Sequence, residues 1–153
     1  IQSGKPLVAL RTTSHGFSLS SGEPPAGLDH WPEFDAQILG GKYSGDYGKP
    51  FSMKVGLAEG VAGHPILTGV SGKGFAVSAS LYKTGPLADT AAALLVATAD
   101  GVEESQPAAW THQRPKGGRV FYTSLGHEED FERLDFQRLL RNSVYWAAGL
   151  PVR

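Results

Sequence analysis

The chain has 153 residues, 41% hydrophobic and 19% charged, which is an ordinary composition for one globular domain. Its 14 basic and 15 acidic side chains give a formal net charge of −1, and the absence of a basic run argues against nucleic acid as a partner. The absence of cysteine excludes disulfides, thiolate metal sites and a cysteine nucleophile, but leaves the cellular compartment open. No apolar run is long enough to predict a membrane span.

The first predicted element is a short apolar strand from Pro6 to Arg11, typical of a centrally buried strand in a parallel sheet. It runs directly into a small polar cluster, Thr12-Thr13-Ser14-His15. A loop rich in Ser, Gly and Pro covers residues 18–30. A short helix is expected from Pro32 to Leu39, ended by Gly40-Gly41.

The middle of the chain is dominated by strand patterns. A helical turn is expected within His64–Gly69, and strands are expected at Phe51–Val55, Ser78–Thr84 and Ala92–Thr98. Two further strands, Gln106–His112 and Arg119–Leu125, flank a Pro-Lys-Gly-Gly turn, so they predict a β-hairpin.

The last predicted element is a helix that ends before Gly149-Leu-Pro151, and the residues that recur in it at helical spacing are Phe136, Leu139, Leu140, Ser143, Val144 and Ala147. Strands therefore outnumber helices. A parallel strand at Pro6 needs neighbouring strands and crossover helices, and too few helices are predicted to cover both faces of a parallel sheet. We therefore expect residues upstream of Ile1 to belong to the same domain.

The first candidate site follows the strand Arg119–Leu125, which stops at Gly126 and then presents His127 beside three carboxylates, Glu128-Glu129-Asp130. A carboxylate bonded to one imidazole nitrogen fixes the tautomer and raises the basicity of the other nitrogen. This arrangement suits general acid–base chemistry on a sugar hydroxyl or an adjacent C–H. The alternative is an acidic helix cap in which His127 is a structural polar residue.

The second candidate site is the cluster from Thr12 to His15. It lies at the end of the predicted parallel strand, where open α/β sheets bind ligands. Its hydroxyls and backbone N–H groups would hold a sugar or an anion, and Arg11 would anchor a carboxylate or a phosphate. The alternatives are a hydroxyl-rich turn that closes the strand and a buried structural ion pair for Arg11.

A metal site would need His15, His127 and a nearby carboxylate as ligands. No close histidine spacing supports such a set, so no cofactor is expected, with a divalent metal ion as the alternative. The other three histidines, His30, His64 and His112, are expected to be structural or exposed.

Four aromatic residues, Trp31, Phe34, Tyr43 and Tyr47, lie in or near a glycine-rich segment. They are candidates for a carbohydrate-facing wall, or for a lid or interface packed on the core. Trp110 and Trp146 are expected in the core.

Seven segments, spread in order over nearly the whole chain, are informative together. They are Gly4–His15, His64–Val70, Ser80–Tyr82, Pro107–Trp110, Gly117–His127, Phe136–Leu140 and Trp146–Gly149. In this order they resemble the trehalose-utilisation (ThuA-like) family, whose fold is that of the glutamine amidotransferases. The most specific piece is Gly-Arg-Val-Phe-Tyr-Thr-Ser-Leu-Gly-His, followed by a helix that ends in Trp-Ala-Ala-Gly.

The resemblance implies an α/β fold, a flavodoxin-like or glutamine-amidotransferase-like three-layer sandwich with a mostly parallel sheet. Residues 1–153 would be a single ThuA-like domain without its N-terminal elements. The implied function is the utilisation of trehalose or a related glycoside, with a His/carboxylate site at the carboxyl edge of the sheet. The residues expected to act in catalysis are His127, Glu129 and His15, and those expected to bind ligand are Arg11, Thr12, Thr13, Ser14 and Tyr82.

Glutamine amidotransferases carry a cysteine at a strand-to-helix elbow, three residues before a histidine, and a later His-x-Glu pair. By spacing, Thr12 takes the cysteine position and His15 that of the following histidine, and His127 and Glu129 resemble the later pair. Without the thiol, cysteine-dependent glutamine hydrolysis is not expected, and hydroxyl chemistry through Thr12 or Ser14 is a weaker option.

The expected partner is a small carbohydrate. A non-catalytic binding or assembly module is the alternative, either as a homo-oligomer or with a partner chain that supplies the missing N-terminal elements. The proposed pocket requires that the loops carrying His15 and His127 meet at the carboxyl edge of one sheet.

Overall fold

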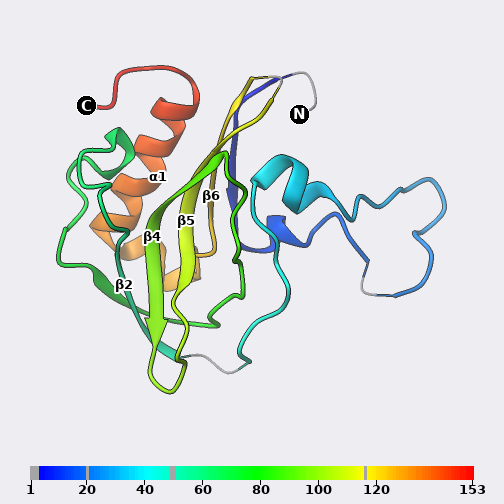
Figure 1. The fold of residues 1–153 in the computed structure, drawn as a ribbon, viewed down its shortest axis with the longest axis horizontal. Helices are drawn as coiled ribbons and strands as arrows, with labels where there is room; N and C mark the ends of the chain where they lie inside the picture. The colour runs from blue at the N-terminus through cyan, green and yellow to red at the C-terminus, as the bar shows by residue number, and fades with distance from the viewer. Residues whose placement is uncertain (1–3, 20, 49–50, 116) are drawn as a thin grey trace.

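The structure, a computed structural model, describes residues 4–19, 21–48, 51–115 and 117–153. Its centre is a six-stranded sheet with the order β1-β6-β5-β4-β2-β3. The strands are β1 (Leu7–Leu10), β2 (Phe51–Leu57), β3 (Phe75–Ala79), β4 (Ala91–Ala99), β5 (Gln106–Gln113) and β6 (Arg119–Thr123). One α-helix, α1 (Leu134–Ala147), packs on one face of the sheet (Figure 1). The short helical turns are Arg11–Ser14, Asp35–Leu39, Pro65–Leu67 and Glu128–Glu132.

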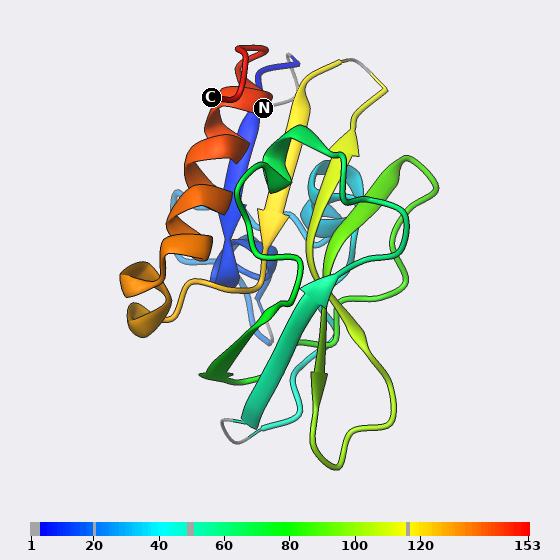
Figure 2. The same ribbon diagram turned by 90° about the vertical axis from the view of Figure 1, so that its left-hand side faces the viewer.

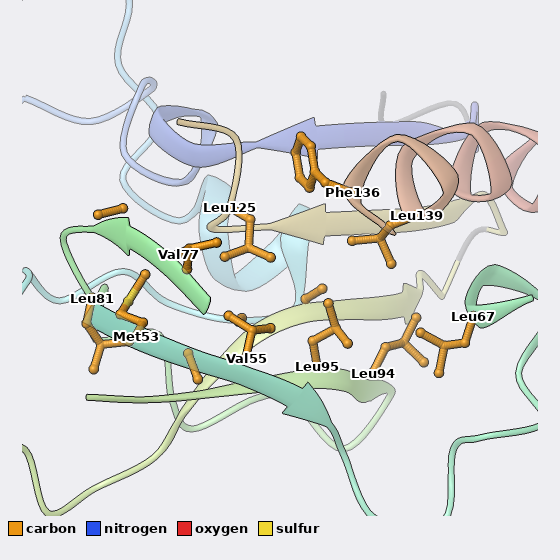
Figure 3. Close-up of a cluster of buried hydrophobic side chains, with 14 of the residues drawn as sticks. Met53, Val55, Leu67, Val77, Leu81, Leu94, Leu95, Leu125, Phe136 and Leu139 are labelled. Carbon is orange, nitrogen blue, oxygen red and sulfur yellow. The ribbon is translucent and has the colours of Figure 1, made fainter. Parts of the chain in front are cut away.

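The two faces of the sheet carry separate hydrophobic clusters. On the α1 side, Phe136 and Leu139 point from the helix toward the sheet and belong to the same cluster as Leu125, Val55 and Leu95 (Figure 3). On the other side, the segment around Asp35–Leu39 covers Trp110 and Tyr122. The fold is therefore α/β with three layers, but the second outer layer consists mainly of loop and a single helical turn (Figures 1 and 2).

The prediction of a mostly parallel sheet is wrong. Among the described residues, β1 and β6 are the one pair of strands that runs in parallel and the other four pairs are antiparallel, so the sheet is mixed. The short connections explain this difference, because a parallel crossover needs about a dozen residues or more. The β4–β5 connection, 100–105, and the β5–β6 connection, 114–118, are shorter than that.

The prediction of a central position for the first strand is also wrong for the described residues. β1 is the terminal strand of the sheet, and of its four residues only Ala9 is buried. Its apolar sequence reflects contacts with the layers above and below it, since Val8 and Leu10 pack toward α1 and Leu7 packs toward the opposite cluster.

The hairpin and the last helix are confirmed. β5 and β6 pair with Ala109 opposite Thr123, although Lys116 in the predicted turn lies outside the described residues. Helix α1 buries Phe136, Leu139, Ser143 and Ala147 as its periodicity predicted, whereas Val144, expected on the same face, is exposed. The strand predicted at Ser78–Thr84 is shifted, because β3 ends at Ala79 and Tyr82 forms only an isolated bridge with Asp46.

The helix predicted at Pro32–Leu39 is a shorter π-helical turn, Asp35–Leu39. It ends at Gly40 as expected, and this glycine has a φ of 75°, the left-handed conformation that glycine adopts without strain. A Cβ at Gly40 would lie 2.5 Å from Cγ of His112, so the close approach to β5 also requires glycine. The chain then continues to Tyr43 over the carboxyl end of β1.

Candidate active site

The parallel pairing of β1 with β6 brings two distant loops together. Leu10 is opposite Thr123, so the segment that starts at Arg11 and the segment that starts at Ser124 leave the same edge of the sheet. Nη1 of Arg11 donates to the Ser124 carbonyl at 3.5 Å. A Cβ at Gly126 would lie 3.3 Å from Leu10 Cδ2 and 3.6 Å from Arg11 Cγ. The two loops are therefore in contact, as the sequence predicted.

Three side chains contact the imidazole of His15, and Arg11 lies next to one of them. Its ring stacks on Tyr43 with centroids 4.2 Å apart, and it meets the edge of Tyr82 at 5.9 Å. Oγ of Ser14 lies 3.2 Å from Nδ1 of His15. The Arg11 guanidinium lies over the Tyr82 ring, 5.4 Å from its centroid. An aromatic, partly buried cluster thus stands at the carboxyl end of β1.

Burial of the His15 ring favours its neutral form. Burial is the main cause that lowers the pKa of His15; the Asp46 carboxylate opposes this shift, and the positive charge of Arg11 adds to it. The hydroxyl of Tyr43 donates to Oδ2 of Asp46 at 3.1 Å. Burial, followed by this carboxylate, raises the pKa of Tyr43 to about 12. At neutral pH the site therefore holds an imidazole able to accept a proton and a phenol that remains a hydrogen-bond donor.

Arg11 adopts an unusual backbone conformation. Its φ is 44°, and it is the only non-glycine residue with a positive φ in the part of the chain that the structure describes. The buried Tyr122 donates a hydrogen bond from its hydroxyl to the Arg11 carbonyl at 2.8 Å. Strain of this kind costs on the order of 1–3 kcal/mol and persists where the surroundings enforce it. Here Tyr122, a residue of the core, holds the strained turn.

The three hydroxyl residues of the predicted cradle differ in their surroundings. Thr12 is exposed. The hydroxyl of Thr13 donates to the Leu10 carbonyl at 2.8 Å and so closes the strand. Ser14 is only 2% exposed, and its hydroxyl lies against the His15 ring. Thr12 and His15 are the members of this turn that are most open to a ligand.

The loop after β6 is organised by a buried carboxylate. Asp130 is 2% exposed, and its Oδ2 accepts hydrogen bonds from the backbone N–H groups of Gly126 (2.8 Å) and His127 (3.0 Å). His127 is the N-cap of the turn Glu128–Glu132 and shares a capping box with Asp130, which is the structural alternative raised for this residue, and its Nδ1 is buried. Glu129 is exposed, and no hydrogen bond to His127 is found for it within the described ranges. Within the predicted acidic segment it is Asp130, and not Glu129, that contacts the backbone of His127.

The structure brings most of the predicted residues to one edge of the sheet, but in two groups. Arg11, Ser14, His15 and Tyr82 form one group and His127 belongs to the other, with Arg11 touching both loops. In the described part of the chain, no hydrogen bond or ring contact joins His15 to His127 directly. The role of Asp46 was missed, because it depends on its bridge to Tyr82, 36 positions later in the sequence.

The aromatic residues of the glycine-rich segment have different positions. Tyr43 contacts His15, whereas Tyr47 lies under the Lys83 ammonium. Phe34 is in the core, where Trp31 and Phe17 pack against it. Tyr43 is therefore the member of this group that a ligand at His15 would meet.

The other histidines have structural contacts or lie exposed. His64 caps the turn Pro65–Leu67 by accepting the Ile66 N–H at 3.2 Å, and His112 is buried beside Thr90. His30 is exposed. Within the described residues, no group of three or more histidine or acidic side chains is placed to hold a metal ion.

An open cavity of about 570 Å³ lies elsewhere, between Gly85-Pro86 and residues 103–107. None of the predicted site residues lines it. Among the described helices, none has the length and apolar character needed to cross a membrane.

Asp35 links the stability of this region to pH. Its carboxylate is buried and accepts the Tyr43 N–H at 3.1 Å, and burial raises its pKa from 3.8 to about 6. Between pH 4 and 6 the unfolded chain therefore loses a proton that the folded chain keeps, so stability falls as the pH rises through this window. At pH 4 the free energy of unfolding of Asp35→Asn should equal that of the wild type. At pH 7.5 it should exceed the wild-type value by at most about 3 kcal/mol.

Urea unfolding at the two pH values measures this difference. Asp89→Asn, at an exposed position, serves as the matched control and should change stability by less than about 0.5 kcal/mol at both pH values. Equal differences between Asp35→Asn and the wild type at pH 4 and pH 7.5 would refute the raised pKa.

Comparison with known proteins gives one family. No match was found among curated proteins. The profile of the ThuA family, described as trehalose utilisation, matches residues 23–147, which includes β2 to β6 and all of α1. The match covers most of the chain and contains Tyr43, Tyr82 and His127, while Arg11 and His15 precede it. The chain belongs to the trehalose utilisation (ThuA) family.

Proposed function

We propose that this chain acts in the utilisation of trehalose or a related glycoside by binding a small carbohydrate where β1 and β6 end. The observation that carries this proposal is the contact between the Arg11–His15 turn and the Ser124–His127 loop at the carboxyl end of the one parallel strand pair. Open α/β sheets bind ligands at such an edge. Family membership supplies the link to trehalose.

The residues at this edge are chemically suited to a sugar. The partly buried Tyr43 and His15 rings offer an aromatic surface, and Asp46, Thr12 and the tyrosine hydroxyl offer hydrogen-bond partners for sugar hydroxyls. The lowered pKa of His15 keeps its imidazole neutral, as a general base requires.

We assign acid–base roles on the sugar to His127 and His15, with Glu129 as the carboxylate that orients His127. Arg11, Thr12, Thr13, Ser14 and Tyr82 form the ligand cradle. The reaction class is proton transfer at a hydroxyl or an adjacent C–H, since a cysteine nucleophile is absent from the sequence.

His127→Ala should abolish turnover, with a loss of at least about 100-fold, and should leave the fold intact. The fold should survive because the buried carboxylate of Asp130 still accepts the backbone N–H groups of residues 126 and 127 when the imidazole half of the capping box is lost. The measurement is product formation from trehalose and a panel of glycosides, together with the thermal unfolding midpoint. His30→Ala, at an exposed histidine, is the control and should retain full activity. If His127→Ala turned over substrate at the wild-type rate, His127 would have no part in the mechanism.

A non-catalytic binding or assembly module is the second candidate. Two features favour it: Thr12 takes the position of the amidotransferase nucleophile, and β1 has no strand on its outer side among the described residues. An unpaired strand edge is able to pair with another chain. A solution mass measurement separates the candidates, because a stable monomer that turns over a glycoside favours the enzyme and obligate association without turnover favours the module.

A further inference from the structure

We propose that Arg11 binds an anionic group, a carboxylate or a phosphate, on the carbohydrate, so that the site prefers acidic or phosphorylated sugars to neutral ones. This inference rests on the proposed carbohydrate site and adds the substrate class. It begins from the position of Arg11, directly after β1 and beside the end of β6, with a side chain that reaches Tyr82 and Ser124.

The guanidinium has donors to spare. Its polar contact with the described residues is a long hydrogen bond of 3.5 Å from Nη1 to the Ser124 carbonyl, and an arginine has five N–H donors. The ion pairs formed by the described residues join Asp130 with Arg133 and Asp135 with Arg138, and neither includes Arg11. The structural alternative of a buried ion pair for Arg11 is therefore not supported by these residues.

The partly buried guanidinium is also held in place. Tyr122 fixes the strained Arg11 backbone through its hydroxyl, and the ring of Tyr82 lies beneath the guanidinium. An arginine fixed on an aromatic ring loses little rotamer entropy when it forms further hydrogen bonds, and its planar fork fits a carboxylate or phosphate with two parallel bonds. A strained residue at a strand end, held by the core, is typical of a functional position.

The carboxylate of Asp46, opposite in charge to Arg11, indicates how the ligand would be oriented. Both Arg11 and the Asp46 carboxylate act on the His15 ring, and Asp46 is bonded to the Tyr43 hydroxyl. An anionic group would be attracted to Arg11 and repelled by Asp46. We therefore expect the anion at the β1–β6 edge and sugar hydroxyls toward Tyr43 and Asp46.

Calorimetric titrations of the full chain with glucose, glucuronate and glucose 6-phosphate test this preference. The wild type should bind one of the two anions at least about tenfold more tightly than glucose, because charge-assisted bonds to arginine are strong. A tighter Kd for glucuronate assigns a carboxylate to the site, and a tighter Kd for glucose 6-phosphate assigns a phosphate. Arg11→Gln should remove the preference by weakening the binding of the preferred anion at least about tenfold more than the binding of glucose, and Arg11→Lys should keep part of the preference.

Arg138→Gln is the matched control, since it removes an exposed guanidinium from α1 and should leave the preference unchanged. Equal affinity of the wild type for all three sugars would overturn the inference and leave the proposed carbohydrate site standing. An anion preference that survives in Arg11→Gln would also overturn the inference and leave the carbohydrate site standing. Failure of every sugar to bind the wild type would overturn both.

Discussion

Replacing Trp110 by alanine is expected to lower the free energy of unfolding by about 3–5 kcal/mol, the usual range for deleting a large buried aromatic side chain. Trp110 is 1% exposed, packs on Tyr122 with ring centroids 4.4 Å apart, and donates its indole N–H to the Leu39 carbonyl at 2.7 Å. The substitution leaves a cavity and an unsatisfied carbonyl, which adds to the cost.

Trp110→Ala should also disturb the position of Tyr43 in the candidate site. Trp110 also contacts the glycine turn that leads to Tyr43, since a Cβ at Gly41 would lie 2.7 Å from its Cζ2. Chemical denaturation gives the unfolding free energy. Trp31→Ala is the control, because Trp31 is partly exposed and its hydrogen bond to Gln37 lies at the surface. An equal loss of stability in both variants would contradict the packing described for Trp110.

Asp130→Ala is expected to cost about 2–4 kcal/mol and to lower turnover as strongly as the loss of His127 itself. The reason is that one buried carboxylate oxygen accepts the N–H groups of both Gly126 and His127. Without it, two donors lose their partner and the loop that carries His127 loses its conformation.

Denaturation and turnover, measured on the same samples, test this role of Asp130. Glu129→Ala is the neighbouring control for stability, since Glu129 is exposed and should change the unfolding free energy by less than about 0.5 kcal/mol. A turnover loss in Glu129→Ala without a loss of stability would support its predicted role in orienting His127. A stable and active Asp130→Ala would show that the loop does not depend on this carboxylate.

Local features of the sequence predicted most of the elements. The helical spacing of Phe136 and Leu139 and the stop at Gly149 located α1, and the glycines at 117 and 118 located the β5–β6 hairpin. These signals are short-range, because they depend on periodicity and on the conformations that glycine allows.

The direction of the strands could not be obtained in this way. An apolar strand such as Leu7–Leu10 has the same composition at the edge of a mixed sheet as at the centre of a parallel one. The lengths of the connections contained the missing information, since short links such as 100–105 favour antiparallel pairing.

The candidate site was predicted as two strand ends, and their contact follows from a single parallel pair, β1 with β6. What the sequence could not predict is the set of partners contributed by distant loops. Tyr43 reaches His15 because Ser44 and Tyr47 hydrogen-bond to the segment Leu81–Lys83, and no local pattern encodes these bonds. For the same reason, the sequence favoured Glu129 as the partner of His127, while the backbone hydrogen bonds belong to Asp130.

The most direct test of the shared site is a titration followed through the imidazole proton signals of His15 and His127 in NMR spectra, with a carbohydrate that binds the wild type. If both loops form one site, the two signals should shift together with a single Kd, and those of the exposed His30 should not move. Shifts confined to one of the two imidazoles would contradict the account. So would shifts of backbone amides around the separate cavity at Gly85 and Gln106 while both imidazoles stay unchanged.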